Sequence, residues 1–208
     1  MESTKRDRDR EPDRRLTLHR PRRPRILHCV AITAVSLLAL AGLLVLVFWL
    51  VVRPSLLRCS VDKAHLRGFN VTDNALTATF NLTLEVHNPN RKVVVYYDRV
   101  EVAVWYDGQM LALNEVAPFY QPRRDVRMLK VDLVARSRPL LSSVETSLKQ
   151  DQSAGEAAVE VRLRAMVRFK VGLLKTDHYT LRAYCSPVLV RFSPSVTQFQ
   201  KVYCDVYI

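Results

Sequence analysis

The chain is 208 residues long and carries a net charge of +12, from 32 Lys and Arg against 20 Asp and Glu. Hydrophobic residues make up 49% of it, enough apolar surface to offset backbone ordering, which excludes a chain that is disordered throughout. Four cysteines are too few for a disulfide-dense miniprotein, and five glycines leave little room for glycine-rich phosphate loops. The positive charge points to an acidic partner, and its position along the chain indicates which one.

The first 25 residues form a basic segment without apolar periodicity. Ten Lys or Arg, five Asp or Glu and three prolines fall here, so we predict that residues 1–25 are a disordered cytosolic tail. The arginines that directly precede an apolar run are Arg20, Arg22, Arg23 and Arg25. We interpret them as a topology signal and as a lipid-proximal basic cluster that attracts anionic lipid. Nucleic acid is not a predicted partner, because no aromatic residue lies among these arginines to stack on bases.

Residues 26–53 contain a long apolar run with no charge from Cys29 to Val52. At about 1.5 Å per residue such a helix spans roughly 36 Å, more than a hydrocarbon core of about 30 Å. A core helix would show a polar face, and this run shows none. A small-x-small pattern ending at Ala41 permits signal-peptide cleavage, but the apolar run continues beyond it. We therefore predict a transmembrane signal anchor at 26–53, and the larger basic charge before it predicts a cytosolic N-terminus.

Residues 54–208 have the size of one domain, and their pattern is dominated by period two. In 76–87 every even position is apolar and every odd position is polar, which predicts a half-buried strand. The same alternation runs through 159–171, where the arginines between the apolar positions are interpreted as a solvent-exposed face. Further strands are predicted near 60–67, 93–97, 100–106, 109–116, 125–134, 178–190 and 201–207.

One stretch has helical spacing instead. Leu141, Val144 and Leu148 follow Ser137 and Pro139 at intervals of three and four, which predicts a single amphipathic helix. This succession of strands in about 150 residues, with one short helix, predicts a mainly β domain built as an antiparallel β-sandwich.

The chain contains no motif of catalysis. No hydrolase nucleophile elbow, zinc-protease helix motif, P-loop, dinucleotide fingerprint or paired metal-ligand cysteine spacing occurs in the sequence. The five histidines are scattered, and His87 is interpreted as a polar strand-end residue. We therefore predict no catalytic residues, no metal, no cofactor and no enzymatic activity.

Residues 88–90, Asn-Pro-Asn, directly follow the strand predicted at 76–87. Proline has a fixed φ and no amide donor, and asparagine tolerates left-handed conformations, so the triplet predicts a defined turn. In the block 87–98, and in 106–108 and 118–121, the chain strongly resembles the plant harpin-induced-like and non-race-specific disease-resistance-like family. The family-motif residues are Asn88, Pro89, Asn90, Tyr96, Tyr97 and Asp98.

That family belongs to the late-embryogenesis-abundant group with a water-stress and hypersensitive-response domain, and the resemblance covers about residues 54–208. It implies a fibronectin- or immunoglobulin-like β-sandwich and a single-pass protein of the plasma membrane. It also implies a non-enzymatic role in plant defence or stress response. The noncytosolic domain is then expected to act by binding a protein partner that the sequence does not identify. Two alternatives stay open: a soluble domain released by cleavage after Ala41, and a stress-protective domain without a specific partner.

Two sequons follow the membrane segment, at Asn70 and Asn81, and both are candidates for N-glycosylation in a noncytosolic domain. Asn81 is expected on the polar face of its strand, and Asn70 is expected in a loop, where a glycan is easier to accommodate.

The four cysteines divide between the two parts of the chain. Cys29 lies at the predicted cytosolic end of the apolar run and is interpreted as a small apolar residue, with palmitoylation as the alternative. Cys185 and Cys204 lie on late predicted strands, and an oxidising compartment permits a disulfide that closes a loop of about 20 residues. Two buried thiols are the alternative. The bridge leaves Cys59 as an odd thiol, either free or linking two chains.

Overall fold

The structure is a computed structural model that describes residues 23–52, 55–192 and 199–208. The chain divides into two compact units, Met1–Arg53 and Pro54–Ile208. Most of the predicted tail, with Arg20 and Arg22, lies outside the described residues.

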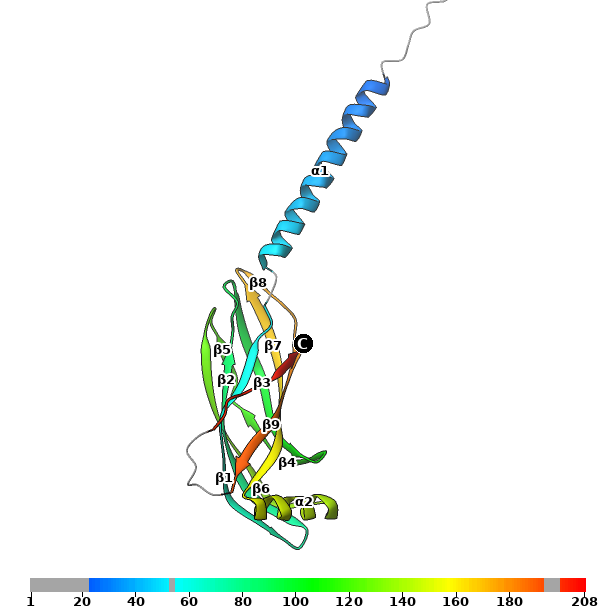
Figure 1. Ribbon diagram of the computed structural model, residues 1–208. Helices are drawn as coiled ribbons and strands as arrows, with labels where there is room; N and C mark the ends of the chain where they lie inside the picture. Colours follow the sequence, from blue (N-terminus) through cyan, green and yellow to red (C-terminus); the bar gives the residue numbers. More distant parts are fainter. Residues whose placement is uncertain (1–22, 53–54, 193–198) are drawn as a thin grey trace, which may run out of the picture. The chain divides into compact units, whose positions relative to one another are not determined.

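The first unit contains the helix α1 (Arg23–Val52), which begins within the predicted basic cluster (Figure 1). Its segment Leu27–Leu46 has a mean hydropathy of 2.7 and is long and apolar enough to cross a membrane. The side chains of this segment are exposed, unlike those of a core helix in a soluble domain. An exposed surface this apolar fits a membrane anchor, because lipid is its favourable solvent.

The second unit is mainly β, and strands and one short helix follow one another along it (Figure 1). Its described elements are β1 (Arg58–Thr72), β2 (Ala75–His87), β3 (Val93–Tyr106), β4 (Gln109–Val116), β5 (Phe119–Gln121), β6 (Val126–Pro139), α2 (Ser142–Ala154), β7 (Glu156–Val171), β8 (Leu174–Lys175), β9 (Tyr179–Arg191), β10 (Val202–Tyr203) and β11 (Asp205–Tyr207).

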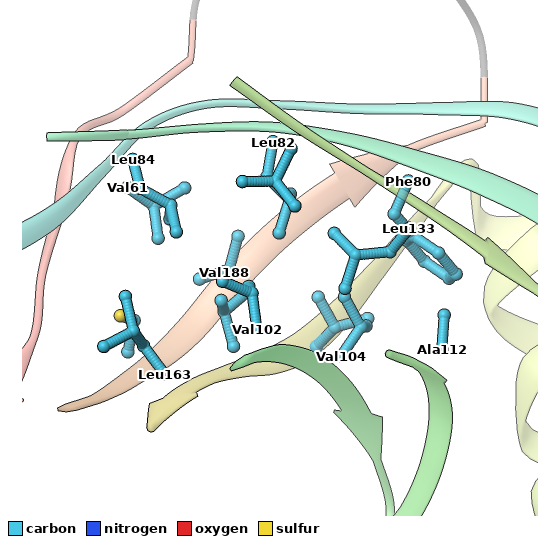
Figure 2. Packing of buried hydrophobic residues seen from close by; sticks show 14 of the residues in the cluster. Val61, Phe80, Leu82, Leu84, Val102, Val104, Ala112, Leu133, Leu163 and Val188 are labelled. Atoms are coloured by element: carbon cyan, nitrogen blue, oxygen red, sulfur yellow. The ribbon is translucent and has the colours of Figure 1, made fainter. Parts of the chain in front are cut away.

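The strands form two antiparallel sheets. Sheet A has the order β10-β1-β2-β6, and sheet B has the order β11-β9-β7-β3-β4, with β5 paired to β3 and β8 paired to β7. Side chains from both sheets point into one core, as Figure 2 shows for Leu82 and Leu84 of sheet A and Val102, Leu163 and Val188 of sheet B. The predicted mainly β architecture with a short helix is confirmed, and its immunoglobulin-like subtype stays a prediction.

Alternation along single strands decides which residues enter this core. In β2 all six apolar even positions, from Leu76 to Val86, are at most 5% exposed. In β7 the odd positions from Ala157 to Val167 are buried, and the residues between them are more accessible. Period two therefore predicted the buried faces of both strands correctly.

The prediction of separate strands at 93–97 and 100–106 was wrong, because β3 is continuous. Its register against β7 shifts between Tyr97 and Arg99, so that Asp98 is an extra residue in the ladder. The inward positions are odd before this bulge and even after it. One inserted residue reverses the alternation without ending the strand.

The helix α2 confirms the predicted amphipathic helix, with Val144 and Leu148 buried. Leu141 was placed wrongly on its apolar face: it precedes the helix in an extended conformation and is 62% exposed. Leu140 is buried in its place, and its amide donates to the Asn74 carbonyl at 2.7 Å. The extended backbone at Leu141 turns these neighbouring side chains to opposite sides.

The strand predicted at 201–207 is two strands in different sheets. β10 pairs with β1 of sheet A, and β11 pairs with β9 of sheet B. Cys204 is the single residue between them, so the chain changes sheets at this cysteine.

Candidate binding face

The Asn-Pro-Asn triplet, here called the asparagine turn (Asn88–Asn90), ends β2 as predicted, with both asparagines buried. The Asn88 side-chain amide donates to the carbonyls of Val93 at 2.9 Å and Pro122 at 2.8 Å. Its Oδ1 accepts the backbone amide and the side-chain amide of Asn90, each at 3.1 Å. Four hydrogen bonds therefore satisfy the polar atoms of a side chain that has no contact with solvent.

The asparagine turn also holds the segment that leads into β1. The Ser55 amide donates to Asn90 Oδ1 at 2.7 Å, and Asn90 Nδ2 donates to the Ser55 carbonyl at 2.9 Å. On the other side, the Arg124 amide donates to the Asn90 carbonyl at 3.1 Å. These contacts join three chain segments, which gives the family motif a structural role.

Tyr97, the inward residue of the motif, extends this buried network. Its hydroxyl donates to Gln121 Oε1 at 3.3 Å, and its ring stacks on Phe119 with centroids 4.4 Å apart. Gln121 Nε2 donates to the carbonyls of Val86 at 2.8 Å and Asp125 at 3.0 Å. Burial raises the pKa of the Tyr97 hydroxyl, so this group remains a neutral donor.

Tyr96 and Asp98 point to the opposite side of sheet B. The Arg168 guanidinium donates to both carboxylate oxygens of Asp98, through Nε at 2.6 Å and through a second nitrogen. His178 Nε2 lies 3.4 Å from the same carboxylate, and the Lys175 ammonium lies 4.7 Å from the centre of the Tyr96 ring. Hydrogen bonding from Arg168 lowers the pKa of Asp98 below its ordinary value.

The outer side of sheet B carries a surface that the motif does not include, and we call it the arginine–aromatic face. It consists of Trp105 on β3, Arg162 and Arg164 on β7, Arg182 and Tyr184 on β9, and Tyr207 on β11. Their side is set by alternation, because the neighbouring residues of β7 and β9 are buried in the core.

Arg162 is the centre of this face. Its guanidinium lies 4.1 Å from the Trp105 ring centroid and 5.9 Å from that of Tyr184. Nε and a second nitrogen donate to the Glu160 carboxylate at 2.8 and 2.9 Å, which holds the guanidinium plane in place. The Tyr184 and Tyr207 rings meet edge to face with centroids 6.1 Å apart. The aromatic groups are thus ordered before any partner binds.

Arg164 and Arg182 lie directly opposite each other in the register of β7 and β9. Among the described residues, neither guanidinium has a carboxylate within ion-pair distance. Glu101 lies opposite Arg164 on β3, but its carboxylate is 3.5 Å from Arg99. Like charges placed directly opposite destabilise an antiparallel pair, so this face carries positive charge that the fold itself does not use.

The two sequons differ in their surroundings. Asn70 lies in β1 opposite Thr77, so its placement in a loop was wrong, although the residue is exposed. Both strands of this hairpin continue to the turn at residues 73–74, which leaves no loop at the sequon. Asn81 is half-buried in β2 and donates through Nδ2 to Asp132 at 2.6 Å. Use of either sequon stays a prediction.

The structure contains the predicted disulfide between Cys185 and Cys204, with their Cα atoms 4.2 Å apart. Cys29 and Cys59 are free thiols. Cys59 is 6% exposed, and burial raises the pKa of its thiol to about 12. A thiol buried in this way is out of reach of a second chain.

The apolar helix, the two-sheet domain and the asparagine turn define the class of the chain: a mainly β domain that follows an N-terminal apolar segment. The sequence profile described as "Late embryogenesis abundant protein" matches residues 83–185. A crystal structure of a protein from Archaeoglobus fulgidus aligns over 66% of this chain and 99% of its own, with 11% identity and a TM-score of 0.30, too low to define the fold.

Three curated relatives from Arabidopsis thaliana are each 30% identical to this chain. NDR1/HIN1-like protein 10 aligns over 164 residues, which are 77% of this chain and 72% of the relative. NDR1/HIN1-like protein 3 covers 83% of this chain and 77% of itself, and NDR1/HIN1-like protein 1 covers 84% and 85%. This chain therefore belongs to the NDR1/HIN1-like family, a family of plant stress and defence proteins, as its motif predicted.

Proposed function

We propose that this chain is a non-enzymatic, single-pass protein of the plasma membrane whose noncytosolic β domain binds a protein partner in plant defence or stress response. The observation that carries the proposal is the arginine–aromatic face. Trp, Tyr and Arg are the side chains most enriched at the centres of protein interfaces. Here they are gathered on one side of a rigid sheet, and Tyr184 and Tyr207 are 37% and 58% exposed.

The chemistry of the face supports a partner with an acidic surface. Arg164 and Arg182 carry two positive charges with no carboxylate partner among the described side chains, and a carboxylate placed between them would relieve their repulsion. The nearby rings supply apolar area that loses little conformational freedom on binding, because the Arg162 and Tyr184 contacts already order them.

Two features support the membrane topology of the proposal. The helix α1 has the length and hydropathy of a membrane anchor, and basic residues crowd its N-terminal side. The Cys185–Cys204 bridge suits an oxidising compartment, which is where the β domain resides if the N-terminus is cytosolic.

The binding proposal is tested by proximity labelling from the full-length chain in plant cells, with Arg164→Glu and Arg182→Glu combined in one variant. The matched control is Lys130→Glu with Arg136→Glu, which makes the same charge change on two exposed residues of β6 in sheet A. We expect the first variant to lose its labelled partners and the control to keep them. Equal labelling by both variants would show that the face does not bind.

Topology is tested separately with protease added outside intact cells. We expect the domain at 54–208 to be digested and an N-terminal tag to survive, because the basic tail stays in the cytosol. Digestion of the tag with survival of the domain would show that the orientation is the reverse of the proposed one.

Changing Asn70 and Asn81 to Gln, separately and together, adds an independent readout of topology, since each glycan lost increases gel mobility. Intact mass of the mature chain distinguishes the anchor from cleavage after Ala41.

A further inference from the structure

Three cysteine sulfurs meet where the end of the chain crosses between the two sheets. The Sγ atoms of Cys59, Cys185 and Cys204 all lie within 4.8 Å of one another. Two of them form the disulfide, and the third is a free thiol. We propose that these residues form a thiol–disulfide exchange site, in which Cys59 takes Cys204 from Cys185 and transfers the covalent link from sheet B to sheet A.

The position of Cys204 makes it the shared member of both pairs. It is joined through sulfur to Cys185 on β9, and its backbone amide donates to the Cys59 carbonyl on β1 at 3.0 Å. The short strands on either side of Cys204 pair with those same two strands, β10 with β1 and β11 with β9. Either bridge is therefore compatible with the backbone pairing that already holds this segment.

The exchange step balances without an added oxidant or reductant. Cys59 releases its thiol proton to water, and its sulfur attacks Sγ of Cys204. The Cys59–Cys204 bond forms while the Cys185–Cys204 bond breaks, and Cys185 leaves as a thiolate that takes up a proton. One disulfide and one thiol are present before and after the step.

Burial controls the rate of this step. Desolvation raises the pKa of Cys59 to about 12, so only a minute fraction of the thiol is ionised near neutral pH. In the closed structure Cys59 is therefore a protected thiol. Opening of β10, which has only two residues paired to β1, admits water and ionises Cys59 more readily.

The two bridges constrain the domain differently. Cys185 and Cys204 are 19 residues apart in sequence, so the existing bridge ties down only the end of the chain. The exchanged bridge spans 204 − 59 = 145 residues and encloses almost the whole domain. On the chain-entropy account the longer loop restricts the unfolded state more, so the exchanged form resists unfolding better. It also frees β11, which carries Tyr207 of the arginine–aromatic face, from its covalent tie to β9.

The test uses the full-length chain in detergent with Cys29→Ser, which removes the thiol of α1 and leaves one free thiol. The protein is purified without reductant, incubated at pH 6 to 9, quenched with acid and alkylated, and its peptides are mapped without reduction. We expect the alkylated position to move from Cys59 to Cys185 and a Cys59–Cys204 peptide to appear. The rate should rise about tenfold per pH unit, with the thiolate fraction. Label that stays on Cys59 at pH 9 would overturn the proposal.

A second variant keeps the test independent of exchange rates. Cys185→Ser leaves only Cys59 and Cys204 in the domain, and we expect them to form a bridge within one chain in a buffer of reduced and oxidised glutathione. The oxidised glutathione accepts the two electrons. The control is Cys59→Ser, which should keep the Cys185–Cys204 bridge. Two free thiols in a folded Cys185→Ser chain, or a bridge between two chains, would show that Cys59 cannot replace Cys185.

Discussion

The asparagine turn and the arginine–aromatic face are two polar regions of the same β domain. They differ in whether their polar side chains are buried and hydrogen-bonded within the protein or exposed to solvent. In the turn, Asn88 is completely buried and its side chain makes four hydrogen bonds inside the protein. On the face, Arg164 and Arg182 point to solvent and lie opposite each other without a carboxylate partner among the described side chains. The first arrangement stabilises the fold, whereas the second is left free to bind.

This difference separates the family motif from the proposed interface. Asn88, Asn90 and Tyr97 are explained by the hydrogen bonds and packing that hold the end of the sandwich together. None of the residues of the arginine–aromatic face belongs to the motif. A motif can thus identify a family through its folding requirements while binding is carried by other side chains.

The largest expected effect is a loss of stability on changing the buried asparagine turn. Asn88→Ala removes four hydrogen bonds and leaves buried polar groups without partners, so we expect the free energy of unfolding to fall by about 3 kcal/mol. Urea unfolding followed by circular dichroism measures the loss. The control is Asn114→Ala, because Asn114 makes an exposed bond to the Asp132 carbonyl and should cost about 1 kcal/mol or less. Equal losses of stability in Asn88→Ala and Asn114→Ala would show that the buried hydrogen bonds of the asparagine turn stabilise the fold no more than an exposed one does.

A smaller loss is expected at the edge of the same network. Tyr97→Phe keeps the stacking on Phe119 but removes the hydroxyl that donates to Gln121. The amide oxygen of Gln121 then stays buried without that donor, which should cost about 1 kcal/mol in the same unfolding measurement. A cost above that of Asn88→Ala would place the centre of the network at Tyr97 instead.

On the arginine–aromatic face, a substitution is expected to raise the free energy of unfolding rather than lower it. Arg182→Glu replaces a like-charge pair with an opposite-charge pair across β7 and β9, and its other cross-strand neighbour is Tyr207 rather than a carboxylate, so stability should rise by about 0.5 kcal/mol. The same variant should bind its partner less well. A variant that gains stability and loses binding would establish that Arg182 serves the interface, whereas a loss of stability would assign Arg182 to the fold.

The smallest effect concerns pH. Arg168 lowers the pKa of Asp98 below its ordinary value of 3.8, so the ionised carboxylate stabilises the folded state above that pH. This contribution is lost as the pH falls through the lowered folded-state value. The stability difference between the native chain and Asp98→Asn should therefore shrink on acidification from pH 6 to about 3. A difference that stays constant would mean that Asp98 acts through packing rather than charge.

Local patterns were sufficient for most of the secondary structure. Alternation identified β2 and β7 and their buried faces, because side chains of a strand point alternately to its two sides. The same logic misjudged β3, where the bulge at Asp98 reverses the alternation and makes one strand resemble two. The apolar helix needed no tertiary information, since its length and lack of charge are properties of the sequence alone.

The sequence by itself determined the apolar segment, the period of the strands, the turn after β2 and the family. Only the tertiary structure decided that Asn88 is buried, that Arg164 faces Arg182, and that Cys59 lies beside the Cys185–Cys204 bridge. The physical reason is the range of the interactions. Periodicity and turn chemistry act between near neighbours, whereas these contacts depend on which strands pair and in which register, and that is settled by the packing of two sheets around one core.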